Sequence, residues 1–179
     1  MHSQQTRKGL NIVFTGVGKG KTSAAMGILM RARGHELKAG VTQFIKGGDW
    51  STGESLLAAL LDIPFESLGD GFTWQKSDHQ RSSRIAQRAW AEAQCWIKDS
   101  EYDVIILDEI TFLFFLEWLD VQECINWVRR NKPPSLHLIW TGRYAPPALI
   151  DFADLVTEMK LIKHPLAEQG LPAQPGIDY

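Results

Sequence analysis

The chain has 179 residues, of which 44% are apolar and 22% charged, a balance typical of one folded domain rather than a disordered chain. Its 19 Lys and Arg residues against 21 Asp and Glu residues give a formal net charge of −2, so a broad basic surface for nucleic acid is not expected. The two cysteines form neither a disulfide framework nor a zinc-ligand spacing, and seven tryptophans are many for a chain of this length.

The chain shows no pattern for a membrane partner or for export. Its longest strongly apolar run, residues 110–116, is far shorter than the roughly 18 residues of a membrane span. Residues 1–8 are polar and lack the apolar core of a signal peptide. We therefore expect a cytoplasmic protein with reduced thiols.

Short apolar, β-branched runs alternate along the chain with longer stretches of helical periodicity. Strands are predicted at residues 11–15, 39–44, 65–68, 104–107, 136–141 and 155–161. Helices are predicted at residues 21–33, 52–61, 78–100, 121–130 and 146–152. This order predicts a single α/β domain over residues 1–179, with a mostly parallel sheet covered on both faces. Residues 1–9 are a short N-terminal arm, and residues 163–179 are an irregular tail punctuated by Pro and Gly.

A glycine-rich loop, residues 16–22 (GVGKGKT), joins the first predicted strand to the first predicted helix. Its glycines allow a tight turn with inward N–H groups, and the helix N-terminus favours an anion. Lys21 can reach phosphate oxygens, and the Thr22 hydroxyl suits Mg²⁺. The loop is one residue shorter than the pattern G-x-x-x-x-G-K-[ST], because Thr15 stands where the first glycine belongs. The sequence therefore predicts a phosphate site that could hold a triphosphate in another register.

An acidic pair, Asp108-Glu109, follows the predicted strand at residues 104–107. Apolar strands that end in such a pair carry the Mg²⁺ site in phosphate-loop proteins. Alone the motif is weak, because a carboxylate at a strand end is often only solvated or caps a helix. Its pairing with the loop favours a magnesium-nucleotide site.

With these two motifs in place, the sequence resembles the phosphate-loop class of ATP:corrinoid adenosyltransferases. The matching motifs run in family order: TGVGKGKT (15–22), RARGH (31–35), QFIKG (43–47), GFTW (71–74), LDEI (107–110), TGR (141–143), ADLVTEM (153–159), KHP (163–165) and PGIDY (175–179). The resemblance implies a three-layer α/β fold of the P-loop NTPase-like (RecA-like) type. It also implies transfer of the 5′-deoxyadenosyl group of ATP to the Co(I) centre of a corrinoid, with release of triphosphate, in adenosylcobalamin biosynthesis or salvage.

The resemblance further implies roles for individual residues. Catalytic roles fall to Lys21 and to the aromatic pair Phe72 and Trp74, which would close the lower face of the corrin ring and exclude an axial ligand. Without a σ-donor ligand, Co(II) is easier to reduce to Co(I). The nucleotide would be bound by Gly16, Val17, Gly18, Lys19, Gly20, Lys21, Thr22, Ser23, Arg31, Glu109 and Arg143. Mg²⁺, or alternatively the ribose hydroxyls, would be bound by Thr22, Asp108 and Glu109.

The implied ligands and partners are ATP as co-substrate, Mg²⁺, a corrinoid substrate, a second copy of the chain in a homodimer, and a flavoprotein reductant that docks transiently.

Two features depart from the family pattern. Val17 stands where the family usually has Asn, which predicts a weaker nucleotide contact, and the short arm predicts that corrinoid capture is looser or uses another segment. Two alternatives stay open: a P-loop ATPase or kinase acting at the γ-phosphate, and a non-catalytic nucleotide or corrinoid binder.

The remaining polar and aromatic residues favour structural roles. His79 and His164 lack ligand partners at useful spacing, so we expect them to be solvated or to cap helices. Both cysteines, Cys95 and Cys124, are expected to be buried and inert. A solvated helix face is expected for Arg81, Arg84 and Arg88. Packing roles are expected for Trp90, Trp96, Trp118, Trp127 and Trp140, whereas Trp50 lies in a loop near the site without an assigned role.

Overall fold

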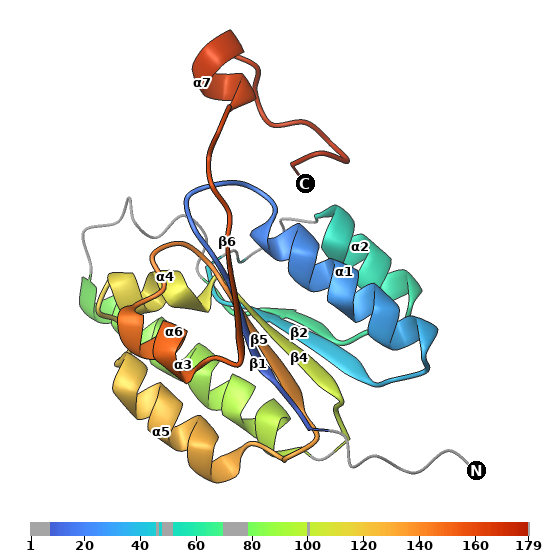
Figure 1. Ribbon diagram of the computed structural model, residues 1–179, viewed down its shortest axis with the longest axis vertical. Helices are drawn as coiled ribbons and strands as arrows, with labels where there is room; N and C mark the ends of the chain where they lie inside the picture. Colours follow the sequence, from blue (N-terminus) through green and yellow to red (C-terminus); the bar gives the residue numbers. More distant parts are fainter. Residues whose placement is uncertain (1–7, 46, 48–51, 70–78, 100, 179) are drawn as a thin grey trace.

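The computed structural model describes residues 8–45, 47, 52–69, 79–99 and 101–178 (Figure 1). Its centre is a six-stranded sheet in the order β3-β2-β4-β5-β1-β6, in which every neighbouring pair is parallel. The strands are β1 (Asn11–Thr15), β2 (Ala39–Gln43), β3 (Phe65–Ser67), β4 (Val104–Asp108), β5 (His137–Thr141) and β6 (Leu155–Glu158). The helices are α1 (Lys21–Gly34), α2 (Gly53–Leu60), α3 (His79–Lys98), α4 (Ile110–Phe115), α5 (Val121–Asn131), α6 (Pro147–Phe152) and α7 (Pro165–Gln169).

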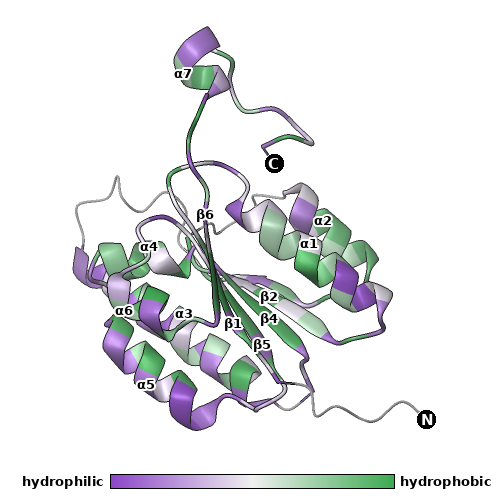
Figure 2. Ribbon diagram, in the orientation of Figure 1, coloured by the Kyte–Doolittle hydropathy of each residue, from purple (hydrophilic) through white to green (hydrophobic). Residues whose placement is uncertain are grey.

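Helices cover both faces of the sheet, which makes three layers. Helices α1 and α2 lie on one face, and α3, α4, α5 and α6 lie on the other, while α7 stands apart above the strand ends (Figure 1). Each face has its own apolar core, because alternate side chains of the central strands point to opposite sides. The hydropathy colouring shows apolar central strands, with the polar residues of the helices turned outward (Figure 2). The predicted α/β class and parallel sheet are confirmed.

The strand order places the two motif-bearing strands one strand apart. The glycine loop follows β1, the acidic pair follows β4, and β5 lies between these strands. This is the RecA-like arrangement that the resemblance implied, and it is confirmed. Because the sheet is parallel, both motifs emerge at its carboxyl edge, where α/β proteins bind ligands.

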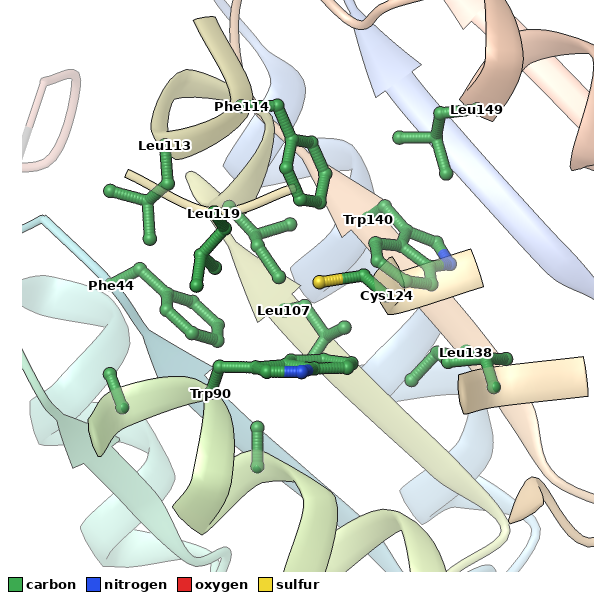
Figure 3. Packing of buried hydrophobic residues seen from close by; sticks show 14 of the residues in the cluster. Phe44, Trp90, Leu107, Leu113, Phe114, Leu119, Cys124, Leu138, Trp140 and Leu149 are labelled. Atoms are coloured by element: carbon green, nitrogen blue, oxygen red, sulfur yellow. The ribbon is translucent and has the colours of Figure 1, made fainter. Parts of the chain in front are cut away.

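Aromatic packing fills the core on the side of α3. The indole of Trp90 lies 6.3 Å from that of Trp140 and 5.6 Å from that of Trp127, measured between ring centroids. Figure 3 shows the side chains of Leu107 and Cys124 packed between Trp90 and Trp140. The other described tryptophans, Trp96 and Trp118, belong to the same cluster, so the packing roles are confirmed. Trp50 and Trp74 lie outside the described residues.

Several local predictions were wrong or incomplete. Helix α4 was not predicted, because its sequence ITFLFF is apolar on every side and has no amphipathic period. The tail contains the short helix α7, whose N-terminus is capped by His164 through Nδ1, which accepts from the Leu166 N–H at 3.2 Å. Cys95 is exposed rather than buried, because it lies on the outward side of α3; Cys124 is buried as predicted.

The helix face of Arg81, Arg84 and Arg88 is exposed as predicted. No helix of the described residues has the length and apolar character needed to cross a bilayer.

Candidate functional site

A cavity of about 730 Å³ lies at the carboxyl edge of the sheet. This volume falls within the range of about 300–1,000 Å³ that is usual for small-molecule sites. Its lining includes the predicted site residues Val17, Gly18, Lys19, Gly20, Lys21, Thr22, Ser23, Glu109 and Arg143. The structure therefore brings most of the residues that the resemblance singled out into one place.

The shape of the glycine loop is set by the chain that follows β6. The N–H of Gly18 donates to the Met159 carbonyl at 2.8 Å, and the Met159 N–H donates to the Thr15 carbonyl at 2.8 Å. Gly16 has a φ of 100°, and a Cβ there would lie 2.4 Å from the Met159 carbonyl oxygen. A Cβ at Gly18 would lie 2.7 Å from the Lys160 carbonyl oxygen. Only glycine fits at these two positions, because a neighbouring backbone already occupies the space.

Lys21 is folded into the loop. Its Nζ donates to the Gly16 carbonyl at 2.8 Å and to the Gly18 carbonyl at 2.6 Å. Burial lowers the pKa of Lys21, and the nearby Arg143 guanidinium lowers it further, while Glu109 and Asp108 act in the opposite direction. A bound phosphate would offset both effects, since it places negative charge beside the partly buried Lys21 and the neighbouring Arg143.

Asp108 is fully buried and ties the first turn of α1 to the sheet. Its Oδ1 accepts from the Thr22 hydroxyl at 2.9 Å and from the Thr141 hydroxyl at 2.6 Å, and its Oδ2 accepts from the Gln43 amide at 2.9 Å. The Thr22 hydroxyl, with its hydrogen given to Asp108, keeps lone pairs for a cation.

Sequence reasoning missed Gln43 and Thr141 as members of this network. Their signal is that each is a polar residue at the last position of a buried parallel strand, β2 or β5. That signal has meaning only once the strand order places both beside β4.

Two backbone segments at the cavity adopt left-handed conformations. Glu109 has a φ of 63° and Tyr144 a φ of 58°, although neither is glycine. Gly142 has a φ of 135°, and a Cβ there would lie 2.4 Å from the Thr111 hydroxyl, which donates to the Arg143 carbonyl at 2.8 Å. Such strain collects at functional sites, and here it turns Glu109 and Arg143 toward the cavity.

The C-terminal tail reaches the same cavity. Asp178 forms an ion pair with Lys19 of the loop, and Ile177 also lines the cavity. The Asp178 carboxylate accepts from the Gln174 N–H at 2.9 Å as well, which fixes its position. This contact was not anticipated from the sequence, although Asp178 belongs to the matched motif at residues 175–179.

Some predicted residues are not brought to the cavity by the described structure. Arg31 lies in the last turns of α1, ten residues beyond Lys21, which is about 15 Å along a helix that rises about 1.5 Å per residue. It is exposed and does not line the cavity. Phe72 and Trp74 lie outside the described residues, so their role stays a prediction.

The fold, the glycine loop and the buried acid beside it define a P-loop nucleotide-binding protein. A family model described as "ATP:corrinoid adenosyltransferase BtuR/CobO/CobP" matches residues 7–179, and the chain belongs to this family.

Relatives named as corrinoid adenosyltransferases match almost the whole chain. A corrinoid adenosyltransferase of Sinorhizobium sp is 41% identical over 182 residues, which cover 100% of this chain and 84% of that protein. One of Escherichia coli (strain K12) is 37% identical over 175 residues, covering 98% of this chain and 88% of the relative. The corrinoid adenosyltransferase CobA of Salmonella typhimurium is 37% identical over 175 residues, with the same coverage of 98% and 88%.

Proposed function

We propose that this protein transfers the 5′-deoxyadenosyl group of ATP to a corrinoid and releases triphosphate. The observation that carries the proposal is the family match over residues 7–179, which includes the shortened loop and the acid pair, whose Glu109 lines the same cavity as the loop. A loop one residue shorter than the usual pattern favours a triphosphate register in which the ribose carbon, rather than the γ-phosphorus, faces the second substrate.

The proposed reaction is a nucleophilic substitution at carbon. The electron pair of Co(I) attacks the 5′ carbon of ATP, the bond between that carbon and its oxygen breaks, and triphosphate leaves with the bonding pair. The cobalt ends as Co(III) bonded to carbon. Reduction to Co(I) needs an electron donor, for which we propose a transiently docked flavoprotein.

The cations of the cavity would stabilise the leaving group. Negative charge grows on the triphosphate as the carbon–oxygen bond breaks, and Lys19, Lys21 and Arg143 line the place where it would lie. Preorganised charges in a partly desolvated site lower the barrier without reorganising during the reaction. For Lys19 this requires that the triphosphate displace Asp178 from its ion pair.

The residues present fit a magnesium ion held mainly by the nucleotide. Among the described residues, no group of three or more His, Cys, Asp and Glu side chains could form a metal cage. Mg²⁺ needs none, since it is commonly bound by one or two protein oxygens together with substrate phosphates. We propose that Thr22 and Glu109 supply those oxygens and that Asp108 holds the Thr22 hydroxyl in place. The ion would contribute charge stabilisation on the triphosphate.

The proposal keeps three further expectations from the sequence. Phe72 and Trp74 would exclude the lower axial ligand of the corrinoid, the chain would act as a homodimer, and it would work in the cytoplasm. The aromatic pair is testable directly: Phe72→Ala and Trp74→Ala should lose activity with Co(II) substrate and a weak reductant. Normal activity in both variants would contradict this role.

The test of the function is product analysis with MgATP and chemically reduced cobalamin. We expect a light-sensitive cobalt–carbon product together with triphosphate, and no turnover in Lys21→Ala. Lys38→Ala is the matched control, because Lys38 is an exposed lysine paired with Glu101 away from the cavity. ADP as the only product would identify an ATPase or kinase instead, and binding without turnover would identify a non-catalytic binder.

A further inference from the structure

One side of the cavity is an aromatic wall formed by Phe112 and Phe115 of α4 and by Tyr144. The ring centroids of Phe115 and Tyr144 lie 4.4 Å apart, those of Phe112 and Phe115 lie 5.8 Å apart, and those of Phe112 and Tyr144 lie 6.4 Å apart. Each ring contacts both others, so the three form one surface rather than separate side chains.

The aromatic wall presents apolar area to the open cavity. Phe115 is 55% exposed and Tyr144 is 45% exposed, although each already packs against the other. Tyr144 also holds a left-handed φ of 58°, a conformation that costs about 1 kcal/mol or more for a residue with a Cβ. Exposed rings on a strained backbone beside a charged site are typical of a surface shaped for a ligand.

The wall is fixed relative to the phosphate loop by its own chain connections. Phe112 lies three residues after Glu109, and Tyr144 directly follows Arg143, so each side of the wall begins at a charged residue of the cavity. The Thr111 hydroxyl donates to the Arg143 carbonyl and joins the two segments. A ligand on the wall would therefore lie next to a triphosphate held by the loop.

The exposed apolar area of the aromatic wall favours a broad ligand. The planes of its rings differ by only 20°, 32° and 33° and the closest centroids lie 4.4 Å apart, so the rings stack on one another and form one aromatic stack on one side of the cavity. Aromatic side chains bury a large apolar area against a ligand, and the corrin macrocycle is the broader apolar group of the two proposed substrates. The polar half of the cavity is already suited to the triphosphate.

Because the polar half of the cavity suits the triphosphate and the aromatic half does not, we infer that the aromatic wall binds the corrin ring of the second substrate. This inference rests on the proposed function. Phe115 and Tyr144 then determine the affinity for the corrinoid, and the loop determines the affinity for ATP.

The test compares the two ligands in variants of the wall. Tyr144→Gly removes a ring and relieves the left-handed backbone, and Phe115→Ala removes an exposed ring; neither change empties the core. Tyr144→Phe keeps the ring, and Leu60→Ala is the control, because Leu60 is an 81% exposed apolar residue of α2 outside the cavity. Binding of hydroxocobalamin and of MgATP is measured separately by equilibrium dialysis, without a reductant.

We expect the Kd for hydroxocobalamin to rise about tenfold in Tyr144→Gly and in Phe115→Ala, the size of effect that one buried aromatic contact produces. The Kd for MgATP should not change, and Tyr144→Phe and Leu60→Ala should resemble the wild type. A rise in the Kd for MgATP alone would assign the wall to the nucleobase and overturn the inference, as would unchanged binding of both ligands. Because no turnover is involved, this result is independent of whether the wild type forms an adenosylated product.

Discussion

Replacing Thr141 by valine tests the network that holds the acid of the site. Thr141 is fully buried, and valine has nearly the same shape, so the substitution removes hydrogen bonds without opening a cavity. Two bonds are lost: the hydroxyl no longer donates to the Asp108 carboxylate at 2.6 Å, and it no longer accepts from the Glu109 N–H at 3.0 Å.

The expected cost follows from these two bonds. A hydrogen bond to a charged group contributes about 1.5–3 kcal/mol, and an abandoned backbone N–H costs about 1–3 kcal/mol when it is fully buried. The Glu109 N–H is only part-buried, so its share lies at the low end. We expect the free energy of unfolding to fall by about 2.5–4 kcal/mol, which corresponds to about 5–15 °C in Tm for a chain of this size.

Thr42→Val is the matched control. Thr42 is also fully buried in the sheet, but its hydroxyl donates to the neutral Ile106 carbonyl at 3.3 Å, so its loss should cost about 0.5–1 kcal/mol. Urea unfolding followed by circular dichroism compares the two variants with the wild type. Equal losses in both variants, or no loss in Thr141→Val, would refute the reasoning that the Asp108 carboxylate is held by charge-assisted bonds.

Three further predictions concern the loop, the tail and the thiols. Because burial lowers the pKa of Lys21, its ammonium loses its proton at a lower pH than that of an exposed lysine. The Kd for MgATP should therefore rise with pH before the ordinary lysine pKa is reached. A Kd that follows the titration of an unshifted lysine would contradict this prediction. Asp178→Asn removes the charge that competes for Lys19 but can still accept from the Gln174 N–H, so the KM for ATP should fall several-fold; an unchanged or higher KM would show no competition. With a disulfide reagent at neutral pH, the native protein should react at one thiol, the exposed Cys95. Cys124 should stay unreactive, because burial, and to a lesser extent the charges of Asp120 and Glu123, raise its pKa to about 12. The Cys95→Ser variant should therefore not react until it is unfolded.

The sequence predicted the parts of the site whose chemistry is local. Consecutive residues form the glycine loop, and its requirement for Gly16 and Gly18 was expected from phosphate binding. The structure gives a second reason, since the backbone of Met159 and Lys160 occupies the space beside both glycines. That contact joins segments more than 140 residues apart, and no pattern within either segment indicates it.

The difference between local patterns and long-range contacts also explains why other residues and one helix were not predicted. Gln43 and Thr141 are ordinary polar residues until the strand order places them beside Asp108. Helix α4 was not predicted from the sequence, because a short helix that is apolar on all sides has the same pattern as a buried strand or loop. Asp178 could not be assigned to Lys19 because the path of the tail depends on tertiary contacts.

The central claim is that ATP reacts at its 5′ carbon, and the bond that breaks can be observed directly. ATP carrying oxygen-18 on the atom bonded to that carbon is incubated with the protein, Mg²⁺ and chemically reduced cobalamin, and the products are analysed by mass spectrometry. Attack at carbon sends the labelled oxygen into triphosphate and leaves none with the nucleoside. Label found in a nucleoside diphosphate, with unlabelled phosphate as the other product, would contradict the claim.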